Sequence, residues 1–191
     1  NCNNQVDEAV QSTFYADSDN DGYGDSANST QACTAPSGYV SDNTDCNDND
    51  ANEYPGQIWH KDLDEDGFGD GTTQNSCARP ANYFLATELT QISGDCNDND
   101  ANEFPGQTWY KDADGDDYGD GTTQTACARP ADHFTAAELT ATNGDCNDGD
   151  AGINPGAIEI CDGIDNNCNA QTDEGVMTTY YEDTDNDGFG N

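Results

Sequence analysis

The sequence predicts an irregular, loop-rich fold built from tandem repeats, with short β-strands and little helix. The formal net charge is -36 and hydrophobic residues make up 32% of the 191 residues, which leaves little apolar surface for one large core. Small units without such a core are typically held by disulfides or metal ions, and nine cysteines are present. An acidic motif also recurs along the chain. These features together indicate an elongated array in which each unit contacts its neighbours.

The acidic motif is a loop with aspartates at alternate positions, followed by an aromatic residue and a glycine. Asp112–Asp120 reads D-A-D-G-D-D-Y-G-D, and similar loops begin at Asp17, Asp62 and Asp183. Carboxylates this close repel one another by roughly 4 kcal/mol per pair at an effective dielectric near 20, so the spacing favours a bound divalent cation. The calcium loop of an EF-hand places its oxygen ligands with the same spacing. The motif therefore predicts calcium sites, with a solvated acidic turn as the alternative for any single copy.

The EF-hand pattern assigns side-chain ligands to loop positions 1, 3, 5 and 9 and a carbonyl ligand to position 7. The bidentate glutamate that ends an EF-hand loop is missing, because position 12 is Asn28, Thr73 or Thr123. We therefore expect additional ligands from elsewhere in the chain. The predicted loop ligands are Asp17, Asp19, Asp21, Tyr23, Asp25, Asp62, Asp64, Asp66, Phe68, Asp70, Asp112, Asp114, Asp116, Tyr118, Asp120, Asp183, Asp185 and Asp187.

Two further oxygen-rich segments are candidates for those additional ligands. A D-C-N-D segment follows each of the first three loops, and an Asn-rich segment lies near the C-terminal end. Carboxylate and amide oxygens suit calcium better than zinc or copper, although any single Asn fits a turn equally well. The predicted ligands here are Asp45, Asn47, Asp48, Asp50, Asp95, Asn97, Asp98, Asp100, Asp145, Asn147, Asp148, Asp150, Asp165, Asn167, Asn169, Asp173 and Glu174.

The recurring motifs divide the chain into repeat units. Unit A spans residues 11–57, unit B spans 58–107, and unit C spans 108–176 and adds a C-D-G-I-D-N-N-C tail. Residues 1–10 match the end of unit C and are interpreted as the truncated end of a preceding repeat. Residues 177–191 match the start of unit A and are interpreted as the truncated start of the next one. We therefore expect the chain to be a slice of a longer array.

The cysteines indicate an oxidising compartment, and hence an extracellular or cell-surface location. The repeat pattern alone favours disulfides within units. Such disulfides would fold each D-C-N-D segment back toward its acidic loop. Cys2 would be left to pair outside the chain or with a neighbouring subunit. The predicted disulfides are Cys33–Cys46, Cys77–Cys96, Cys127–Cys146 and Cys161–Cys168.

Regular secondary structure is weakly encoded. Short strands are expected to enter the acidic loops at residues 14–16, 59–61, 109–111 and 179–182. Residues 83–92 carry Leu85, Leu89 and Ile92 at helical spacing, and the counterpart at residues 132–142 keeps only Leu139; the pattern predicts one short helix per long unit.

The run D-C-N-D-G-D to N-P-G-A-I-E-I-C-D-G-I-D-N-N-C-N, ending in D-E-G, resembles a family of metal-binding repeats of bacterial surface proteins. This is the MopE-type motif, named after a methanotroph surface copper protein. The acidic loops are similar to thrombospondin type 3 calcium repeats. The resemblance implies a secreted array that binds several calcium ions. Copper would call for soft or imidazole ligands, and His60, His133 and Met177 are the only histidines and methionine in the sequence.

These features predict a calcium-binding extracellular structural protein, a stalk, adhesin or filament segment whose partners are further copies of itself. The alternatives are a copper- or other metal-acquisition surface protein and a carbohydrate-binding adhesion module. An enzyme is not expected, since no nucleophile–base motif or phosphate loop occurs. Nucleic acid is disfavoured by the acidic charge, and no stretch is apolar enough for a membrane span. Asn28 begins a weak glycosylation sequon, so glycans are a further candidate partner.

Overall fold

The structure is a computed structural model that describes residues 11–184, 186 and 188–190. Within these residues, short strands joined by turns make up the regular structure, and there is no helix. The prediction of a loop-rich fold with short strands is thus confirmed. The strands are β1 (Ser12–Ala16), β2 (Ser29–Ala32), β3 (Tyr39–Val40), β4 (Ile58–Lys61), β5 (Thr73–Asn75), β6 (Tyr83–Phe84), β7 (Thr108–Lys111), β8 (Thr123–Thr125) and β9 (His133–Phe134).

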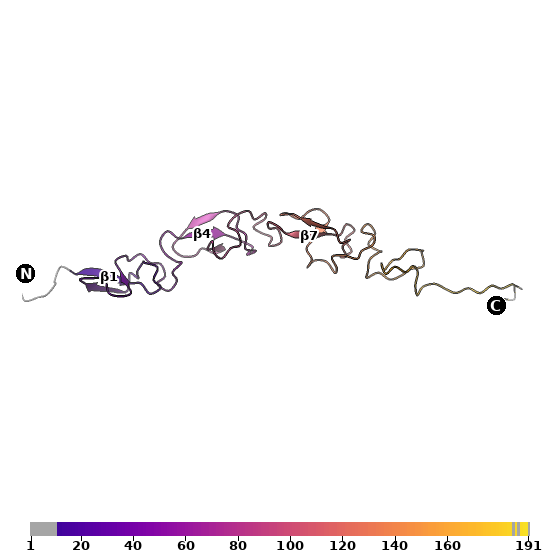
Figure 1. The fold of residues 1–191 in the computed structure, drawn as a ribbon, viewed down its shortest axis with the longest axis horizontal. Helices are drawn as coiled ribbons and strands as arrows, with labels where there is room; N and C mark the ends of the chain where they lie inside the picture. Colours follow the sequence, from indigo (N-terminus) through magenta and orange to yellow (C-terminus); the bar gives the residue numbers. More distant parts are fainter. Residues whose placement is uncertain (1–10, 185, 187, 191) are drawn as a thin grey trace, which may run out of the picture. The chain divides into compact units, whose positions relative to one another are not determined.

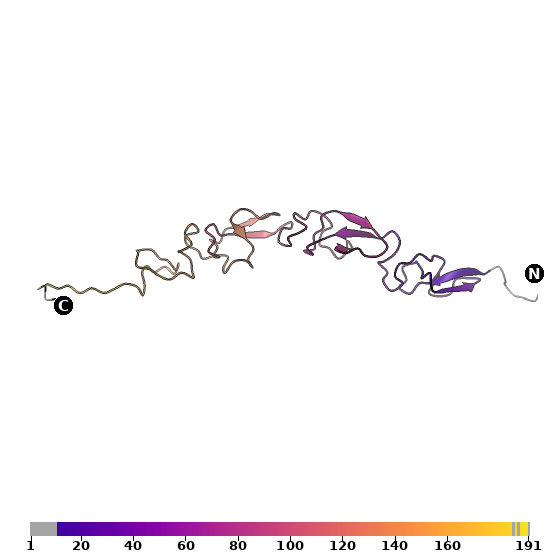
Figure 2. The same ribbon diagram turned by 180° about the vertical axis from the view of Figure 1, so that it is seen from behind.

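The strands form three antiparallel sheets that share one topology. The strand that comes first along the chain lies in the centre, so the orders are β2-β1-β3, β5-β4-β6 and β8-β7-β9. Each sheet is built from one continuous stretch of chain, as Figures 1 and 2 show. The strands predicted at residues 14–16, 59–61 and 109–111 are confirmed as parts of the central strands β1, β4 and β7. Each central strand leads directly into an acidic loop.

A tryptophan anchors the small core of the second and third sheets. Trp59 and Trp109 are fully buried, and their indole N–H groups donate to the carbonyls of Ser76 at 2.9 Å and Ala126 at 3.0 Å. The Arg79 guanidinium lies 4.8 Å from the centroid of the Trp59 ring, and Arg129 stands in the same way over Trp109. The indole thereby contributes both apolar area and a satisfied polar group to a unit that has few other buried side chains.

The helix predicted at residues 83–92 is wrong. Residues 83–84 form strand β6, and the rest of the segment consists of turns with a bridge from Gln91 to Phe68. The amide of Thr90 donates to the Gly67 carbonyl at 2.8 Å, so it bonds to the acidic loop and not to the preceding helical turn. The strand predicted at residues 179–182 is also wrong. No sheet partner lies beside it in the described part of the chain.

The disulfides differ from the predicted pairs. Cys46 is bonded to Cys77, with Cα atoms 5.8 Å apart, and Cys146 to Cys168, with Cα atoms 5.7 Å apart. All four predicted pairs, Cys33–Cys46, Cys77–Cys96, Cys127–Cys146 and Cys161–Cys168, are therefore incorrect. Cys96 and Cys127 are also disulfide-bonded, and Cys161 is exposed and outside any disulfide. Cys2 lies outside the described residues.

The Cys46–Cys77 bond joins the end of unit A to the middle of unit B. The picture of self-contained, individually cross-linked units is thus overturned. Backbone bonds support the same connection, because the Ser76 amide donates to the Gln57 carbonyl at 3.1 Å. Glu53 adds a further link by accepting from the Arg79 amide at 2.9 Å.

The chain divides into two compact parts, Asn1–Pro105 and Gly106–Asn191. The first part contains the sheets centred on β1 and β4, and the second contains the sheet centred on β7. The described residues contain no helix that is long and apolar enough to cross a membrane.

Candidate metal centres

The first aspartate of each acidic loop is buried and organises the loop around itself. Asp17, Asp62 and Asp112 are 8%, 1% and 2% exposed. Each accepts a hydrogen bond from the sixth residue of its loop, at 3.3 Å from Gly22, 3.0 Å from Gly67 and 3.1 Å from Asp117. The sixth residue has a positive φ in all three loops, including 72° at Asp117. An aspartate can adopt this conformation, which explains why the loop tolerates the loss of the EF-hand glycine there.

The alternating aspartates converge. In three groups, one carboxylate oxygen from each member lies within 4.8 Å of those of the others; these groups are Asp17, Asp19 and Asp21; Asp62, Asp64 and Asp66; and Asp112, Asp114 and Asp116. Several of these oxygens are buried and accept no hydrogen bond, among them Asp17 Oδ1, Asp64 Oδ2 and Asp116 Oδ2. A buried carboxylate oxygen without a donor costs stability unless a cation compensates for its charge. The arrangement therefore fits a bound metal ion.

The D-C-N-D segments fold back onto the loops, which is the position expected of segments that provide additional ligands. The amides of Asp45, Asp95 and Asp145 donate to the carbonyl of the loop glycine, at 3.3 Å for Asp45 and 3.2 Å for the other two. Asp145 is 8% exposed, and its carboxylate converges with those of Asp114 and Asp148 in a fourth group. Asp45 Oδ2, Asp95 Oδ2 and Asp145 Oδ2 are all buried without a hydrogen-bond partner. Asp145 thus adds a carboxylate to the third cluster, and Asp45 and Asp95 hold the equivalent position, close enough to repel Asp19 and Asp64.

The loop glycine allows this fold-back. A Cβ at Gly69 would lie 2.8 Å from the Ile92 carbonyl oxygen and 2.9 Å from that of Lys61, and Gly119 is equally confined. Backbone approaches the loop from both sides at this point, so no larger residue fits. The glycine at the eighth position of the motif is thus a packing requirement and not a ligand position.

A second aspartate of each D-C-N-D segment fastens the start of the loop. Asp98 Oδ1 accepts from the Leu63 amide at 2.8 Å, and Asp148 Oδ1 accepts from the Ala113 amide at 2.7 Å. Asp48 accepts from both the amide and the hydroxyl of Ser18, at 2.7 and 2.6 Å.

Stacked aromatic side chains connect the seventh residue of each of the first two loops with the residues that follow its D-C-N-D segment. Tyr23 stacks on Tyr54 with centroids 5.5 Å apart, and Phe68 stacks on Phe104 at 5.3 Å. The amides of Tyr23 and Phe68 donate to the preceding loop aspartates. The aromatic at the seventh position therefore has a packing role in addition to the carbonyl role predicted for it, as does Tyr118, whose hydroxyl lies against Gly156.

The aspartates at the ninth loop position are placed differently. Asp25, Asp70 and Asp120 accept from the amide two residues later, at 2.8, 2.6 and 2.6 Å. None of them belongs to a converging group in the described part of the chain. Their carboxylates stabilise the turn that leads from the loop into the next strand.

Burial and mutual repulsion raise the pKa of several converging carboxyls. Burial is the larger cause and neighbouring aspartates add to it, and in this way the pKa of Asp66 is raised to about 6. The pKa values of Asp19, Asp21, Asp64 and Asp145 are raised for the same reasons. Without a cation, these groups hold their negative charge less readily than ordinary aspartates.

The other predicted ligands of the D-C-N-D segments form turns. Asp50, Asp100 and Asp150 each accept from the amide two residues later, at 3.1 Å in all three cases. The side-chain amides of Asn47 and Asn97 donate to Glu53 and Glu103. In unit C the backbone N–H of Asn147 donates to Asp145 Oδ1 at 2.8 Å. Glu53 and Glu103 were missed by the sequence reasoning, although their recurrence at the same position in units A and B was a usable signal.

The Asn-rich segment forms a compact loop of its own. Asp165 accepts from the amides of Asn169 and Ala170 at 3.1 and 2.7 Å. The side-chain amides of Asn167 and Asn169 both point to Glu174 Oε1, and Glu174 Oε2 is buried without a partner. The segment thus brings predicted ligands together, although the structure identifies no converging group of acidic side chains among them.

Glu159 closes this loop from outside and was not predicted. It is 6% exposed and accepts from the amides of Asn167 and Asp173, at 2.9 Å in both cases. In the fourth acidic loop, Asp183 accepts from the Gly188 amide at 2.9 Å, as the equivalent aspartates do elsewhere. The predicted ligands Asp185 and Asp187 lie outside the described residues.

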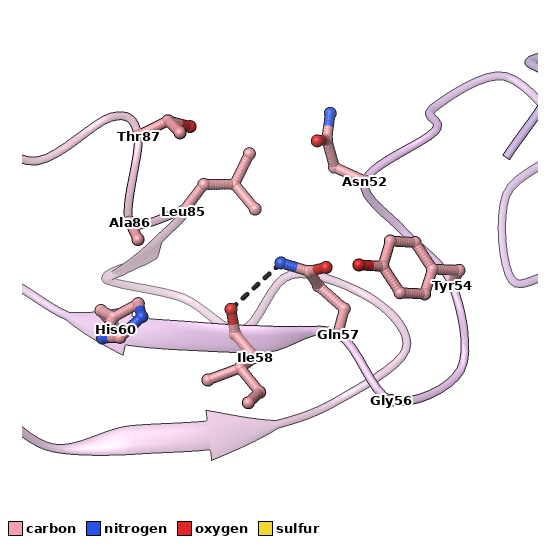
Figure 3. Close-up of a pocket in the computed structure, with 9 residues that line it drawn as sticks. All are labelled: Asn52, Tyr54, Gly56, Gln57, Ile58, His60, Leu85, Ala86 and Thr87. Carbon is pink, nitrogen blue, oxygen red and sulfur yellow. Dashed lines mark hydrogen bonds between the residues drawn. The ribbon is translucent and has the colours of Figure 1, made fainter.

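A hollow of a different character lies in the first compact part. It has a volume of about 440 Å³ and is lined by Asn52, Tyr54, Gly56, Gln57, Ile58, His60, Leu85, Ala86 and Thr87. Figure 3 shows the Tyr54 hydroxyl facing the side-chain amide of Gln57, with the aliphatic side chains of Leu85 and Ile58 on opposite sides of that amide. Tyr54, Ile58 and His60 become Phe104, Thr108 and Tyr110 in the next unit. Unlike the acidic sites, the hollow is therefore not part of the repeating design.

One comparison with known proteins finds a metal-binding motif in the chain. The chain matches a family model described as "Putative metal-binding motif" over residues 1–8, 45–58, 95–109 and 145–174. The matched residues include every D-C-N-D segment and the Asn-rich loop, but not the acidic loops on which those segments fold. The comparisons with curated proteins and with solved structures give no match.

Proposed function

We propose that the chain is a calcium-binding structural repeat protein of the cell exterior, with a role in a stalk, adhesin or filament and no catalytic role. The observation that carries the proposal is the set of converging aspartates whose buried oxygens accept no hydrogen bond. In unit A the ion would be held by Asp17, Asp19, Asp21 and Asp45. It would neutralise their charge and tie the loop to the D-C-N-D segment.

The donor set favours calcium over copper. Each converging group consists of carboxylates, which are hard ligands preferred by calcium. The two histidines lie in different compact parts, and His133 Nδ1 is 2.7 Å from the Ala131 carbonyl oxygen. No converging group among the described residues contains a histidine or a cysteine. A copper-acquisition role therefore has no matching ligand set in the described structure.

The disulfide that joins units A and B supports a structural role. The bond prevents the stretch of chain between its two cysteines from extending under tension, and disulfides are typical of oxidising compartments. Further copies of the chain are the partners that we propose. Light scattering and electron microscopy of the purified protein, with calcium and with chelator, would test for assembly. A monomer under both conditions would contradict the filament role and leave calcium binding unaffected.

Calorimetric titration of metal-free protein with Ca²⁺ and, separately, with Cu²⁺ tests the central claim. We expect calcium to bind at several sites, at least one for each of the three acidic loops, and the near-UV spectrum to change as the loops become ordered. Strong copper binding with no response to calcium would overturn the proposal. The variant Asp64→Asn should remove one calcium equivalent. The variant Asp162→Asn, which changes a carboxylate outside the converging groups, is the matched control.

The hollow around Gln57 favours a second candidate function, the binding of a carbohydrate. Amide, hydroxyl and aliphatic groups line it together, a combination that suits the polar and apolar groups of a sugar ring. A glycan array comparing wild type with Gln57→Ala and with the equivalent Gln107→Ala tests it. Binding lost only in the first variant would support this function, and the absence of any glycan ligand would contradict it.

A further inference from the structure

The three acidic sites differ in one respect that the repeating pattern does not require. In units B and C a lysine immediately precedes the loop. Lys61 Nζ contacts Asp98 and lies 3.1 Å from Asp70, and Lys111 Nζ contacts Asp148 and lies 3.3 Å from Asp120. Each ammonium group thus bridges the D-C-N-D segment and the end of the loop.

Unit A has Ala16 at the equivalent position. The equivalence is structural, because Ala16 donates to Asn28 O at 2.9 Å and accepts from the Asp25 amide, as Lys61 donates to Thr72 O at 3.0 Å and accepts from the Asp70 amide. Ala16 is buried and has no charge to offer.

A neutral hydroxyl takes over part of the lysine's role in unit A. The Ser18 hydroxyl donates to Asp48 Oδ2 at 2.6 Å, so this carboxylate keeps a hydrogen bond but gains no counter-charge. All four basic residues of the chain lie in units B and C. Arg79 does reach back toward unit A, but only to Asp50, which is not a member of a converging group; hydrogen bonds from Asn52 lower the pKa of Asp50, and the Arg79 charge adds to that effect.

Other charges do not remove this difference. Glu65 and Asp117 add a carboxylate to the second and third loops, but both residues are exposed, where water and salt screen them. Asp98 and Asp148 are only 10% exposed at their side chains, so their pairing with lysine acts at closer range and with less screening.

We infer that Lys61 and Lys111 are built-in counter-ions that make the second and third sites less dependent on calcium, so that, of units A, B and C, unit A is the one whose order responds most strongly to the ion. The inference rests on the proposed calcium function. In unit A no lysine relieves the repulsion among Asp17, Asp19, Asp21, Asp45 and Asp48, so at neutral pH a bound cation must relieve more of it. In units B and C part of that repulsion is relieved in the protein itself.

Hydrogen exchange measured by mass spectrometry tests the inference site by site. Peptides covering residues 17–25, 62–70 and 112–120 report on the three loops in the same intact protein, in excess calcium and in excess chelator. We expect the calcium-induced gain in protection to be on the order of tenfold larger for residues 17–25. One unit charge close to a carboxylate cluster changes the equilibrium constant for ordering the loop by roughly that factor. The variant Lys61→Met should raise the gain at residues 62–70 and leave residues 112–120 unchanged.

Two further variants keep the test decisive. Lys61→Arg retains the charge and should behave as wild type, so a change in that variant would indicate lost packing and overturn the counter-ion role. Ala16→Lys should reduce the gain at residues 17–25; if it does not fold, the comparison of Lys61→Met with Lys61→Arg decides. Equal gains at all three loops in the wild type would overturn the inference while leaving calcium binding intact. No gain at any loop would instead contradict the proposed function.

Discussion

Cys46 of one repeat is bonded to Cys77 of the next, although Cys46 lies in the segment that completes the metal centre of its own repeat. The bond closes a stretch with a sequence separation of 31. Asp45, directly before the cysteine, is held to Gly24 by its amide. One short segment therefore connects an acidic loop on one side with the following sheet on the other. The candidate metal centre and the connection between repeats therefore share this segment.

Removing this bond should lower the free energy of unfolding by about 4 kcal/mol, because a loop of this size then gains conformational entropy in the unfolded chain. The variant Cys46→Ser with Cys77→Ser tests this by denaturant unfolding in calcium. Non-reducing digestion of the wild type should recover the peptide pair that contains Cys46 and Cys77. Cys161→Ser, at an exposed position outside any disulfide, is the control and should change neither result. Recovery of Cys46 linked to Cys33 would contradict the structure.

The strands and the acidic loops could be predicted from the sequence because both are encoded locally. Trp59 and Trp109 mark central strands, and the alternating aspartates after them form converging groups as expected. The fold-back of the D-C-N-D segment was also predicted. The predicted cause, a disulfide within the unit, was wrong, since the backbone bond from Asp95 to Gly69 and the Asp98 carboxylate bring the segment to the loop.

The failed predictions concern long-range choices. Repeat register places Cys46 near a cysteine of its own unit and one of the next, and sequence spacing cannot distinguish the two. The leucine spacing at residues 85–92 suggested a helix, but in a unit with so little apolar surface the backbone groups bond to the neighbouring loop. The hydrogen bonds of Glu159 could not be predicted from local sequence either, because its partners lie 8 and 14 residues away.

The extra carboxylate of each centre should matter more than the ninth loop residue. Asp95 Oδ2 is buried without a partner, whereas Asp70 bonds Thr72 and Lys61. We expect Asp95→Asn to weaken calcium binding at the second site by on the order of tenfold or more, from the loss of one charge close to the ion. Asp70→Asn should have a smaller effect on affinity. Calorimetric titration of both variants makes the comparison, and equal losses would show that Asp70 is a ligand.

The stability of the metal-free protein should depend on pH in an unusual direction. The pKa of Asp66 is raised to about 6 by burial and neighbouring aspartates, from an ordinary value of 3.8. Between these values the folded chain binds more protons than the unfolded chain, so the free energy of unfolding falls as pH rises through this range. Metal-free protein should therefore melt at a higher temperature near pH 5 than at pH 7. Saturating calcium should remove or reverse the trend, because the ion competes with the proton. Thermal melts followed by circular dichroism check this, with Asp66→Asn as the variant in which the slope is reduced.

The last prediction concerns the glycine at which the loop, the central strand and the following segment meet. A Cβ on Gly119 would lie 2.8 Å from the Thr142 carbonyl oxygen and 2.9 Å from that of Lys111, and both are backbone atoms that cannot rotate away. Gly119→Ala should therefore cost about 1–3 kcal/mol of overpacking and should also weaken calcium binding at the third site, since the Asp145 amide bonds to the Gly119 carbonyl.

Gly149→Ala in the same repeat is the matched control. The nearest atom to its added Cβ would be Asn147 Oδ1 at 3.8 Å, an ordinary contact with a side chain. Denaturant unfolding and calcium titration of both variants separate the two effects. Full calcium affinity in Gly119→Ala would mean that the segment binds the ion without the close backbone approach seen here, and the fold-back would then be a consequence of metal binding and not its precondition.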